Sequence, residues 1–291
     1  MKIIDGKKIS NEVLDEIKVL VGHRVKNNLK TPHLAAVLVG DDGPSQTYVN
    51  SKIKACKRVG FQSSLFKFDK SISENKLINE IEKININDNI DGFIVQLPLP
   101  KGINQENILD KVLPKKDVDG FNPINYGKMA LGIETFLPAT PAGIIELIKR
   151  YSIDLKGKKC LVIGRSQIVG RPISILLSQN KIFGNATVTV AHSKSDNLKE
   201  LCLDSDVIIS AIGIPEFIKG EMIKTGSTII DVGISRVNDN SSVKGYKIIG
   251  DVDFKSVSDK VGYITPVPGG VGPMTIAMLL KNTLKACSLK D

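Results

Sequence analysis

Short apolar runs alternate with helical patterns along most of the chain, and this alternation restricts the fold more than any other feature. In the first half, runs typical of buried strands lie at 34–39, 63–68 and 92–97. The segments between them carry apolar residues every three or four positions. Because parallel strands need helical crossovers, this order predicts a parallel sheet covered on both faces by helices. We expect the helix before the first strand to begin after Ser10 and the helix after it to be capped by Ser45.

The second half has the pattern of a dinucleotide-binding fold. Strand-like runs lie at 159–164, 186–191, 206–211 and 227–232, and a glycine-containing turn and a helix follow the first of them. Strands and helices that alternate in this way are typical of a doubly wound sheet. We therefore predict a Rossmann-like domain in this half.

The length of the chain and a change of residue composition near its middle both predict two domains. A chain of 291 residues suits two domains of ordinary size, and residues 98–136 are a loop region punctuated by Pro and Gly. After Pro273 an apolar helix is long enough to return to the first domain. We predict an α/β protein with a catalytic domain at 1–136 plus 274–291 and a dinucleotide-binding domain at 137–273.

Composition excludes several classes of protein. Apolar residues make up 42% of the chain and charged residues 24%, which is typical of a globular protein and not of a disordered one. No apolar run approaches the roughly 18 residues that span a bilayer, and the first residues lack the apolar core of a signal peptide, so we expect a cytoplasmic protein. The scattered cysteines and histidines show no spacing typical of a metal site, and none is predicted.

The net charge of +9 favours anionic partners but does not choose among nucleic acid, phosphates and carboxylates. Trp is absent and aromatic residues make up only 5% of the chain, so a surface for stacking bases is not expected. The basic residues are spread along the chain instead of forming one stripe. We expect neither nucleic acid nor a membrane as a partner, and phosphates and carboxylates stay open as the anionic ligands.

The first strand of the second half runs into the segment GRSQIVGRP at 164–172. A strand, a glycine turn and a helix start form a phosphate-binding cradle, because free backbone N–H groups and the helix dipole converge there. The spacing differs from the usual GxGxxG. An ordinary tight turn between strand and helix therefore stays open as the alternative.

The tip of the next strand favours NADP as the cofactor. An NAD-binding domain usually carries an acid about 20 residues after the glycine turn, where it binds the ribose 2′-hydroxyl. Here the strand ends at Ala191, and His192, Ser193 and Lys194 follow without an acid. Together with Arg165 in the glycine turn, Ser193 and Lys194 favour a 2′-phosphate through charge-assisted hydrogen bonds.

Candidate catalytic groups lie in the first half. Tyr48 and Lys52 are four residues apart on one helix face and can move protons together, although a surface helix with an extended Lys is the alternative. Gln96 ends a strand before the segment LPLP, so its amide is presented at the carboxyl end of that strand. Asp117 and Asp119 are two carboxylates in one loop, and either could be merely solvated.

A segment rich in Pro and Gly, TPVPGGVGPMT, lies at 265–275. This composition indicates a rigid wall along which backbone groups approach a flat ligand closely.

Five segments in this order and spacing resemble the bifunctional methylenetetrahydrofolate dehydrogenase/methenyltetrahydrofolate cyclohydrolase family, and the resemblance covers essentially the whole chain. They are YVNSK (48–52), VQLPLP (95–100), KDVDGF (116–121), GRSQIVGRP (164–172) and TPVPGGVGPMT (265–275). One departure is Ala139, where members of the family commonly have Cys, and we expect little effect from it.

The resemblance implies two reactions in one cleft between the domains. NADP+ oxidises 5,10-methylenetetrahydrofolate to the methenyl compound, and water then converts that product to 10-formyltetrahydrofolate. The resemblance implies that Lys52, with Tyr48 and Gln96, catalyses the hydration step. It also implies that Asp119 binds the pterin ring, which leaves Asp117 without a role. A folate wall is implied at Val267, Pro268, Gly269 and Gly270, and NADP binding at Gly164, Arg165, Ser166, Ser193 and Ile234.

The resemblance also implies a homodimer, without naming the interface. Two other functions stay open. A dehydrogenase without the hydrolase activity is one, and the presence of Tyr48, Lys52 and Gln96 argues against it. A nucleotide-sensing protein of the same fold is the other, because a fold alone does not determine a function.

Overall fold

The computed structural model describes residues 1–239, 241–242 and 245–290, and the chain divides into two compact units. One unit contains Met1–Ser10 and Thr140–Thr275, and the other contains Asn11–Ala139 and Ile276–Asp291. Residues 1–10 thus lie with the second half of the chain, whereas we had placed them in the first domain. The reason is that strand β1 (Lys2–Ile3) pairs in parallel with β11 (Tyr263–Ile264).

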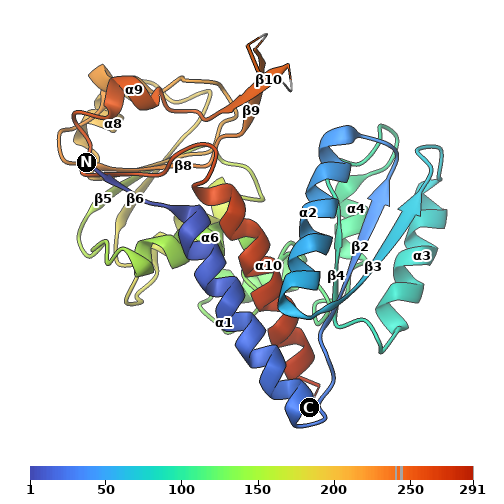
Figure 1. Ribbon diagram of the computed structural model, residues 1–291. Coiled ribbons are helices and arrows are strands. Elements are labelled where there is room, and N and C mark those ends of the chain that lie inside the picture. Colours follow the sequence, from blue (N-terminus) through green and yellow to red (C-terminus); the bar gives the residue numbers. More distant parts are fainter. Residues whose placement is uncertain (240, 243–244, 291) are drawn as a thin grey trace. The chain divides into compact units, whose positions relative to one another are not determined.

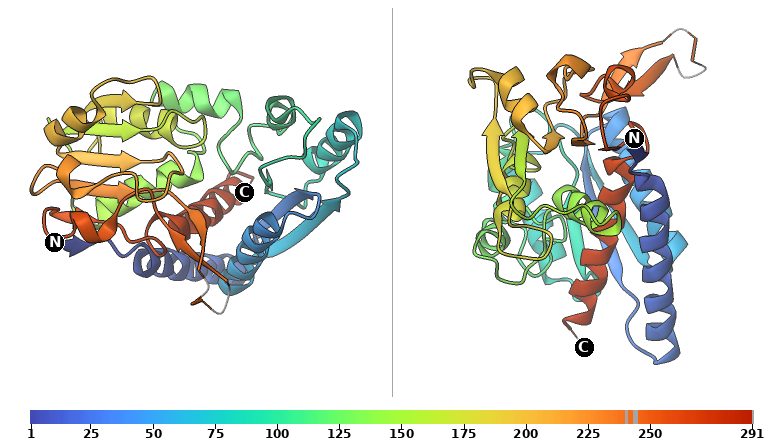
Figure 2. Two further views of the ribbon diagram at one scale, coloured as in Figure 1. Left: turned by 90° about the horizontal axis from the view of Figure 1, so that it is seen from above. Right: turned by 90° about the vertical axis from the view of Figure 1, so that its left-hand side faces the viewer.

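The first unit contains a six-stranded parallel sheet with the order β1-β11-β8-β7-β5-β6 (Figure 2). Four of its strands lie where the apolar runs predicted them. They are β5 (Lys159–Ile163), β6 (Thr187–Ala191), β7 (Val207–Ser210) and β8 (Thr228–Asp231). The helices of this unit are α6 (Ala139–Arg150), α7 (Gly170–Ser178), α8 (Leu198–Asp204) and α9 (Phe254–Val257), with a 3₁₀ turn at Gly220–Met222. The predicted Rossmann-like sheet is confirmed.

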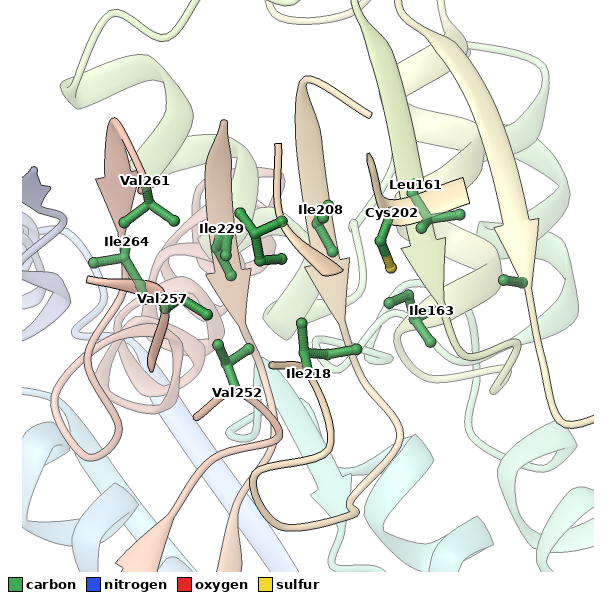
Figure 3. Close-up of a cluster of buried hydrophobic side chains, with 12 residues drawn as sticks. Leu161, Ile163, Cys202, Ile208, Ile218, Ile229, Val252, Val257, Val261 and Ile264 are labelled. Carbon is green, nitrogen blue, oxygen red and sulfur yellow. The ribbon is translucent and has the colours of Figure 1, made fainter. Parts of the chain in front are cut away.

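One face of this sheet forms a dense apolar core (Figure 3). Leu161, Ile208, Ile229 and Ile264 project from four neighbouring strands and are fully buried. Ile218, from a covering segment, packs against the same cluster. Each such side chain contributes about 1.5–3 kcal/mol relative to an exposed one. Strands this short are therefore held in place mainly by their burial.

A two-stranded antiparallel hairpin, β9 (Ser235–Asn238) with β10 (Tyr246–Ile249), belongs to the same unit (Figure 1). We had not predicted it, because neither strand has a clear apolar alternation. The guanidinium of Arg236 lies 4.8 Å from the centre of the Tyr246 ring. This cation–π contact joins the two strands and stabilises the hairpin, whose residues are mostly not buried.

The second unit contains a three-stranded parallel sheet with the order β3-β2-β4 (Figure 1). Its strands are β2 (His33–Val39), β3 (Gln62–Phe68) and β4 (Gly92–Val95), as the apolar runs predicted. Helices α2 (Gly43–Val59) and α3 (Glu74–Ile86) are the crossovers, and α4 (Gln105–Asp110) and α5 (Pro123–Ala130) follow β4. Helix α5 lies in the segment we had described as loop with one short helix.

Two predicted helix starts are wrong, and in both cases an aspartate precedes the serine. Helix α1 (Gly6–Lys26) encloses Ser10, because Asp5 accepts a hydrogen bond from the Lys8 N–H at 2.9 Å. At α2 the N-cap is Asp42, which accepts from both the N–H and the hydroxyl of Ser45. A carboxylate is favoured there because it also interacts with the helix dipole.

The last helix, α10 (Val271–Ser288), begins slightly before Pro273. From Ile276 onward it belongs to the three-stranded unit. Its Asn282 amide donates to Val118 O at 2.8 Å and to Leu137 O at 3.0 Å. The predicted return of the C-terminal helix to the first half of the chain is therefore present. In the described ranges, no helix is both long and apolar enough to span a bilayer.

Candidate active site

Lys52 and Gln96 form the centre of a polar cluster in the three-stranded unit. Lys52 lies on α2, and its Nζ donates a hydrogen bond to Gln96 Oε1 at 3.0 Å. Gln96 directly follows β4, where its backbone N–H donates to Val37 O at 2.9 Å. Its side-chain Nε2 donates to Leu97 O at 2.6 Å. Both ends of the amide are thus engaged, which orients its oxygen toward Lys52.

Asp119 interacts electrostatically with the same lysine. Burial lowers the pKa of Lys52, and the negative charge of Asp119 partly opposes that effect. Burial raises the pKa of Asp119 to about 6, with Lys52 acting in the opposite direction and Asp117 in the same direction. A lysine that deprotonates more easily beside a carboxylate that protonates more easily is a pair suited to proton transfer near neutral pH.

Asp117 organises the loop that carries Asp119. Its carboxylate accepts hydrogen bonds from the backbone N–H groups of Gly120, Phe121 and Asn122 and from the side-chain amide of Asn125, at 2.8 to 3.1 Å. All four lone-pair positions are therefore used within the protein. Of the two carboxylates in this loop, only Asp119 is available to a ligand.

Lys116 is a buried group of the same loop that sequence reasoning missed. Its Nζ donates to Ile84 O at 3.0 Å and to Asn87 O at 2.5 Å, at the C-terminal end of α3. Burial lowers its pKa to about 8. A lysine beside Asp117 in a loop gives no sequence signal of burial, since most lysines are exposed. Its contacts fasten the start of the loop to α3.

Tyr48 lies one helical turn before Lys52 on α2 and is 43% exposed. In the part of the chain that the structure describes, its hydroxyl makes no hydrogen bond. The structure therefore brings Lys52, Gln96 and Asp119 together, and it places Tyr48 beside them with a hydroxyl that is free to contact a ligand.

The glycine turn after β5 can be built only from glycine at two positions. Gly164 has φ +115°, and a β-carbon added to it would lie 2.4 Å from Ala211 O. A β-carbon on Gly170, the first residue of α7, would lie 2.2 Å from Gly164 O. The turn therefore packs closely against neighbouring backbone atoms. Because these two residues have no side chain, a ligand can approach their backbone directly.

Free backbone donors line this turn. Within the described residues, the N–H groups of Arg165, Ser166 and Ile168 donate to no acceptor. The hydroxyl oxygen of Ser166 accepts from the N–H groups of Val169 and Gly170 at 3.2 and 3.3 Å. Unpaired donors at the start of a helix are the arrangement that binds phosphate. The residues present thus fit the pyrophosphate of a dinucleotide.

The turn after β6 lies beside the glycine turn, because β5 and β6 are parallel neighbours. Ser193 and Lys194 are exposed there, as is Arg165. The turn is shaped by His192, whose Nδ1 accepts from the Lys194 N–H at 3.2 Å. The residues directly after β6, 192–195, include no carboxylate. Two cationic side chains and a hydroxyl fit the 2′-phosphate of NADP.

The Pro- and Gly-rich segment 265–275 packs against the start of α1 through its backbone. The Lys7 N–H donates to Gly269 O at 2.8 Å, and a β-carbon on Gly6 would lie 1.8 Å from Gly270 O. Val267 is partly exposed and Pro268 is exposed. The segment is thus a rigid surface strip on the six-stranded unit, as its composition indicated.

Ile234 follows β8 and is 44% exposed. Its Cδ1 atom would lie 3.5 Å from a β-carbon on Gly272, at the start of α10. The predicted site residues therefore fall into two sets. The catalytic group Lys52, Tyr48 and Gln96 and the anchor Asp119 belong to the three-stranded unit, and all the others belong to the six-stranded unit.

Comparison with known proteins gives matches over the full length. A family model described as the tetrahydrofolate dehydrogenase/cyclohydrolase catalytic domain matches residues 4–119, and the NAD(P)-binding domain model of the same family matches residues 138–291. The bifunctional protein FolD of Christiangramia forsetii is 58% identical over 286 residues, which are 98% of this chain and 96% of that protein. The bifunctional protein FolD of Flavobacterium johnsoniae is 54% identical over 291 residues, which cover 100% of this chain and 99% of that protein.

Solved structures agree with these matches. The bifunctional enzyme FolD from Campylobacter jejuni superposes with a TM-score of 0.93 at 44% identity, covering 100% of each chain. The Trypanosoma brucei methylenetetrahydrofolate dehydrogenase-cyclohydrolase, complexed with NADP and an inhibitor, gives a TM-score of 0.94 at 35% identity. It covers 99% of this chain and 97% of its own.

Proposed function

Because this chain belongs to the tetrahydrofolate dehydrogenase/cyclohydrolase family, we propose that it is a bifunctional enzyme of one-carbon metabolism. It oxidises 5,10-methylenetetrahydrofolate to 5,10-methenyltetrahydrofolate with NADP+, and it hydrolyses that product to 10-formyltetrahydrofolate. The observation that carries the proposal is that one chain contains both the Lys52–Gln96–Asp119 cluster and a glycine turn with free N–H donors.

NADP is the cofactor, and when bound it supplies the hydride acceptor for the first reaction. We assign its pyrophosphate to the glycine turn, where Arg165 and Ser166 offer their N–H groups and Gly164 lets the ligand approach the backbone closely. The 2′-phosphate is assigned to Arg165 and Ser193, and the remaining end to Ile234. The NADP complex of the Trypanosoma brucei relative supports this choice of cofactor. Hydride transfer mainly needs two planar partners in contact, so the protein's part is to position them.

Asp119 holds the substrate. Its carboxylate can accept from the 2-amino and ring N–H donors of a pterin, in the two-bond geometry that determines orientation. Val267, Pro268, Gly269 and Gly270 supply a flat backbone surface for the folate. The raised pKa of Asp119, about 6, is still low enough to leave the group ionised at pH 7 to 8.

Lys52 acts as the base of the second reaction. The lowered pKa of Lys52 makes its neutral amine available at a lower pH than that of an ordinary lysine. The amine takes a proton from the water that adds to the methenyl carbon, and the cationic substrate adds to the effect by like-charge repulsion. Gln96 orients the amine through the 3.0 Å hydrogen bond. Tyr48, one turn away, donates or relays a proton as the ring opens.

The test follows reduced nicotinamide, methenyl and 10-formyl products separately after purified protein is mixed with 5,10-methylenetetrahydrofolate and either NADP+ or NAD+. We expect reduction with NADP+ and formation of the 10-formyl product faster than the spontaneous hydrolysis. Reduction that stops at the methenyl compound would leave a dehydrogenase alone. The absence of both signals from folded protein would refute the proposal.

Assembly and location belong to the same proposal. From the family resemblance we propose a homodimer in the cytoplasm, binding small acidic molecules and neither nucleic acid nor a membrane. Light scattering coupled to size-exclusion chromatography tests the dimer, and a mass equal to one chain of 31.6 kDa would contradict it.

A further inference from the structure

Two buried carboxylates, Asp231 and Asp251, lie at the carboxyl end of the six-stranded sheet. Asp231 is the last residue of β8, and both residues are almost completely buried, at 3% and 0% exposure. Asp231 accepts hydrogen bonds from the N–H groups of Gly233, Asp251 and Val252, at 2.9 to 3.0 Å. Neither acid was singled out by the sequence, because Asp at a strand end is usually a turn residue.

Only one of the two carboxylate oxygens of Asp251 accepts hydrogen bonds from described residues. Its Oδ2 accepts from the Ser210 hydroxyl at 3.1 Å and from the Ile212 N–H at 2.8 Å. Its Oδ1 is buried and, among the residues that the structure describes, has no hydrogen-bond partner. This oxygen faces Gly233, since a β-carbon added there would lie 2.1 Å from it.

In the described part of the chain, no cationic side chain forms an ion pair with these two acids. Within the described ranges, no ion pair includes Asp231 or Asp251. Burial raises the pKa of Asp231 to about 6, and the neighbouring charge of Asp251 adds to the effect, so Asp231 is ionised at pH 8. A buried anionic charge is costly unless a positive charge approaches it. The pair therefore indicates a cationic ligand.

The strand order indicates which part of a bound cofactor would reach the pair. The predicted 2′-phosphate site is at the tip of β6 and the pyrophosphate site at the tip of β5, and β7 and β8 follow on the other side of β5. Neighbouring strands are about 4.8 Å apart, so β8 lies about 10 Å beyond the pyrophosphate site. A dinucleotide laid in this direction ends with its nicotinamide ring over β7 and β8. Asp231 ends β8, and Asp251 is bonded to Ser210, which ends β7.

We infer that Asp231 and Asp251 place a negative charge beneath the nicotinamide ring and thereby favour the oxidised, positively charged cofactor over the reduced, neutral one. This inference rests on the proposed function. The two forms of the cofactor differ in charge only at the ring, so the pair stabilises one form selectively. The pair shifts the balance of bound cofactor toward the form that accepts hydride from the folate.

Asp251→Asn removes one charge with little change of structure. The asparagine oxygen can keep both hydrogen bonds from Ser210 and Ile212, and its amide group takes the position of the oxygen that has no partner. Asp231 does not allow this exchange, because both of its oxygens accept backbone N–H groups.

The measurement is the ratio of the dissociation constants of NADP+ and NADPH, from calorimetry and from nicotinamide fluorescence at pH 8. We expect Asp251→Asn to raise the ratio Kd(NADP+)/Kd(NADPH) about tenfold, the size that two charges would give at an assumed separation of about 10 Å and an effective dielectric near 20. Ser210→Ala is the first control, since it removes a hydrogen bond but keeps the charge. Asp204→Asn is the second, because it removes an exposed charge before the amino end of β7. Both controls should leave the ratio unchanged.

Two results overturn the inference. One is a ratio within twofold of the parent while both dissociation constants rise together, which would show a purely structural role. If Asp251→Asn does not fold, the same ratio is measured in the parent at pH 8 and pH 6. Protonation of Asp231 on lowering the pH should raise the ratio, and an unchanged ratio is the second contradicting result.

The side chains that contact this pair do not change their charge between pH 8 and pH 6. The side chains hydrogen-bonded to the pair, Ser210 and Thr265, do not titrate in this range. The 2′-phosphate is assigned to the β6 end of the sheet and is the same in both cofactor forms. A parent protein that binds neither form contradicts the proposed function itself, and this outcome is visible before any variant is made.

Discussion

Asp119→Asn should stabilise the protein while it destroys substrate binding. Burial raises the pKa of this carboxyl from 3.8 to about 6. At about 1.4 kcal/mol for each tenfold change in the acid constant, the ionised group therefore costs the folded state about 3 kcal/mol. The pKa of about 6 already includes the attraction by Lys52, so the substitution removes the net cost. We expect a gain of about 3 kcal/mol in the free energy of unfolding at pH 8.

The gain should depend on pH in a defined direction. The pKa is raised in the folded state, so the cost is fully present above about pH 6 and declines as the pH falls toward about 4, where the carboxyl is protonated in both states. At pH 5 the advantage of Asp119→Asn should be about half of that at pH 8. Urea unfolding followed by circular dichroism at both pH values measures this difference.

Asp117→Asn is the matched control, two residues away in the same loop. Burial raises the pKa of Asp117 as well, but its two oxygens accept four hydrogen bonds. An amide cannot accept on both sides, so this variant should lose about 2–4 kcal/mol. The reasoning is refuted if Asp119→Asn is less stable than the parent at pH 8, or if its advantage does not shrink on acidification.

Three further predictions concern the two sites. Lys52→Gln should slow methenyl hydrolysis by about 10²–10⁴-fold, which is the usual contribution of a general base. The Kd for NADP+ should stay unchanged. Hydrolysis at the parental rate in a stopped-flow assay would exclude Lys52 as the base. Arg165→Ala should weaken NADP+ more than NAD+, as measured by calorimetry, and an equal loss for both would contradict its assignment to the 2′-phosphate. Gly170→Ala places a β-carbon 2.2 Å from Gly164 O, so it should destabilise the fold by about 1–3 kcal/mol and weaken the binding of both NADP+ and NAD+. Unchanged thermal melting and cofactor affinity would show that the turn can adjust.

Most regular elements could be predicted because their signal is local. The apolar runs at 34–39 and 227–232 became β2 and β8, since period and apolar length are properties of a few consecutive residues. The helix starts at Ser10 and Ser45 were wrong because several capping residues lie close together in both places, and the sequence does not rank them. The β9–β10 hairpin was missed because its strands are not apolar.

The site residues divide in a similar way. Glycines that permit a close backbone approach, such as Gly164, are visible in sequence because no other residue accepts their geometry. The assignment of Lys52, Gln96 and Asp119 to one cluster is different, since they lie on a helix, a strand end and a loop. Their separate motifs suggested roles, and the fold brings them together.

The sequence by itself determined the parallel α/β class, the glycine turn after β5 and the chemical types available for catalysis, because periodicity and residue chemistry are local. The tertiary structure alone decided that β1 joins the sheet of the second half and that the Asp117 carboxylate is hydrogen-bonded within its own loop while Asp119 is available to a ligand. It also decided that Asp251 is buried and, among the described residues, forms no ion pair. Burial, hydrogen-bond partners and pKa depend on residues far away in sequence. They are therefore set only when the chain has folded.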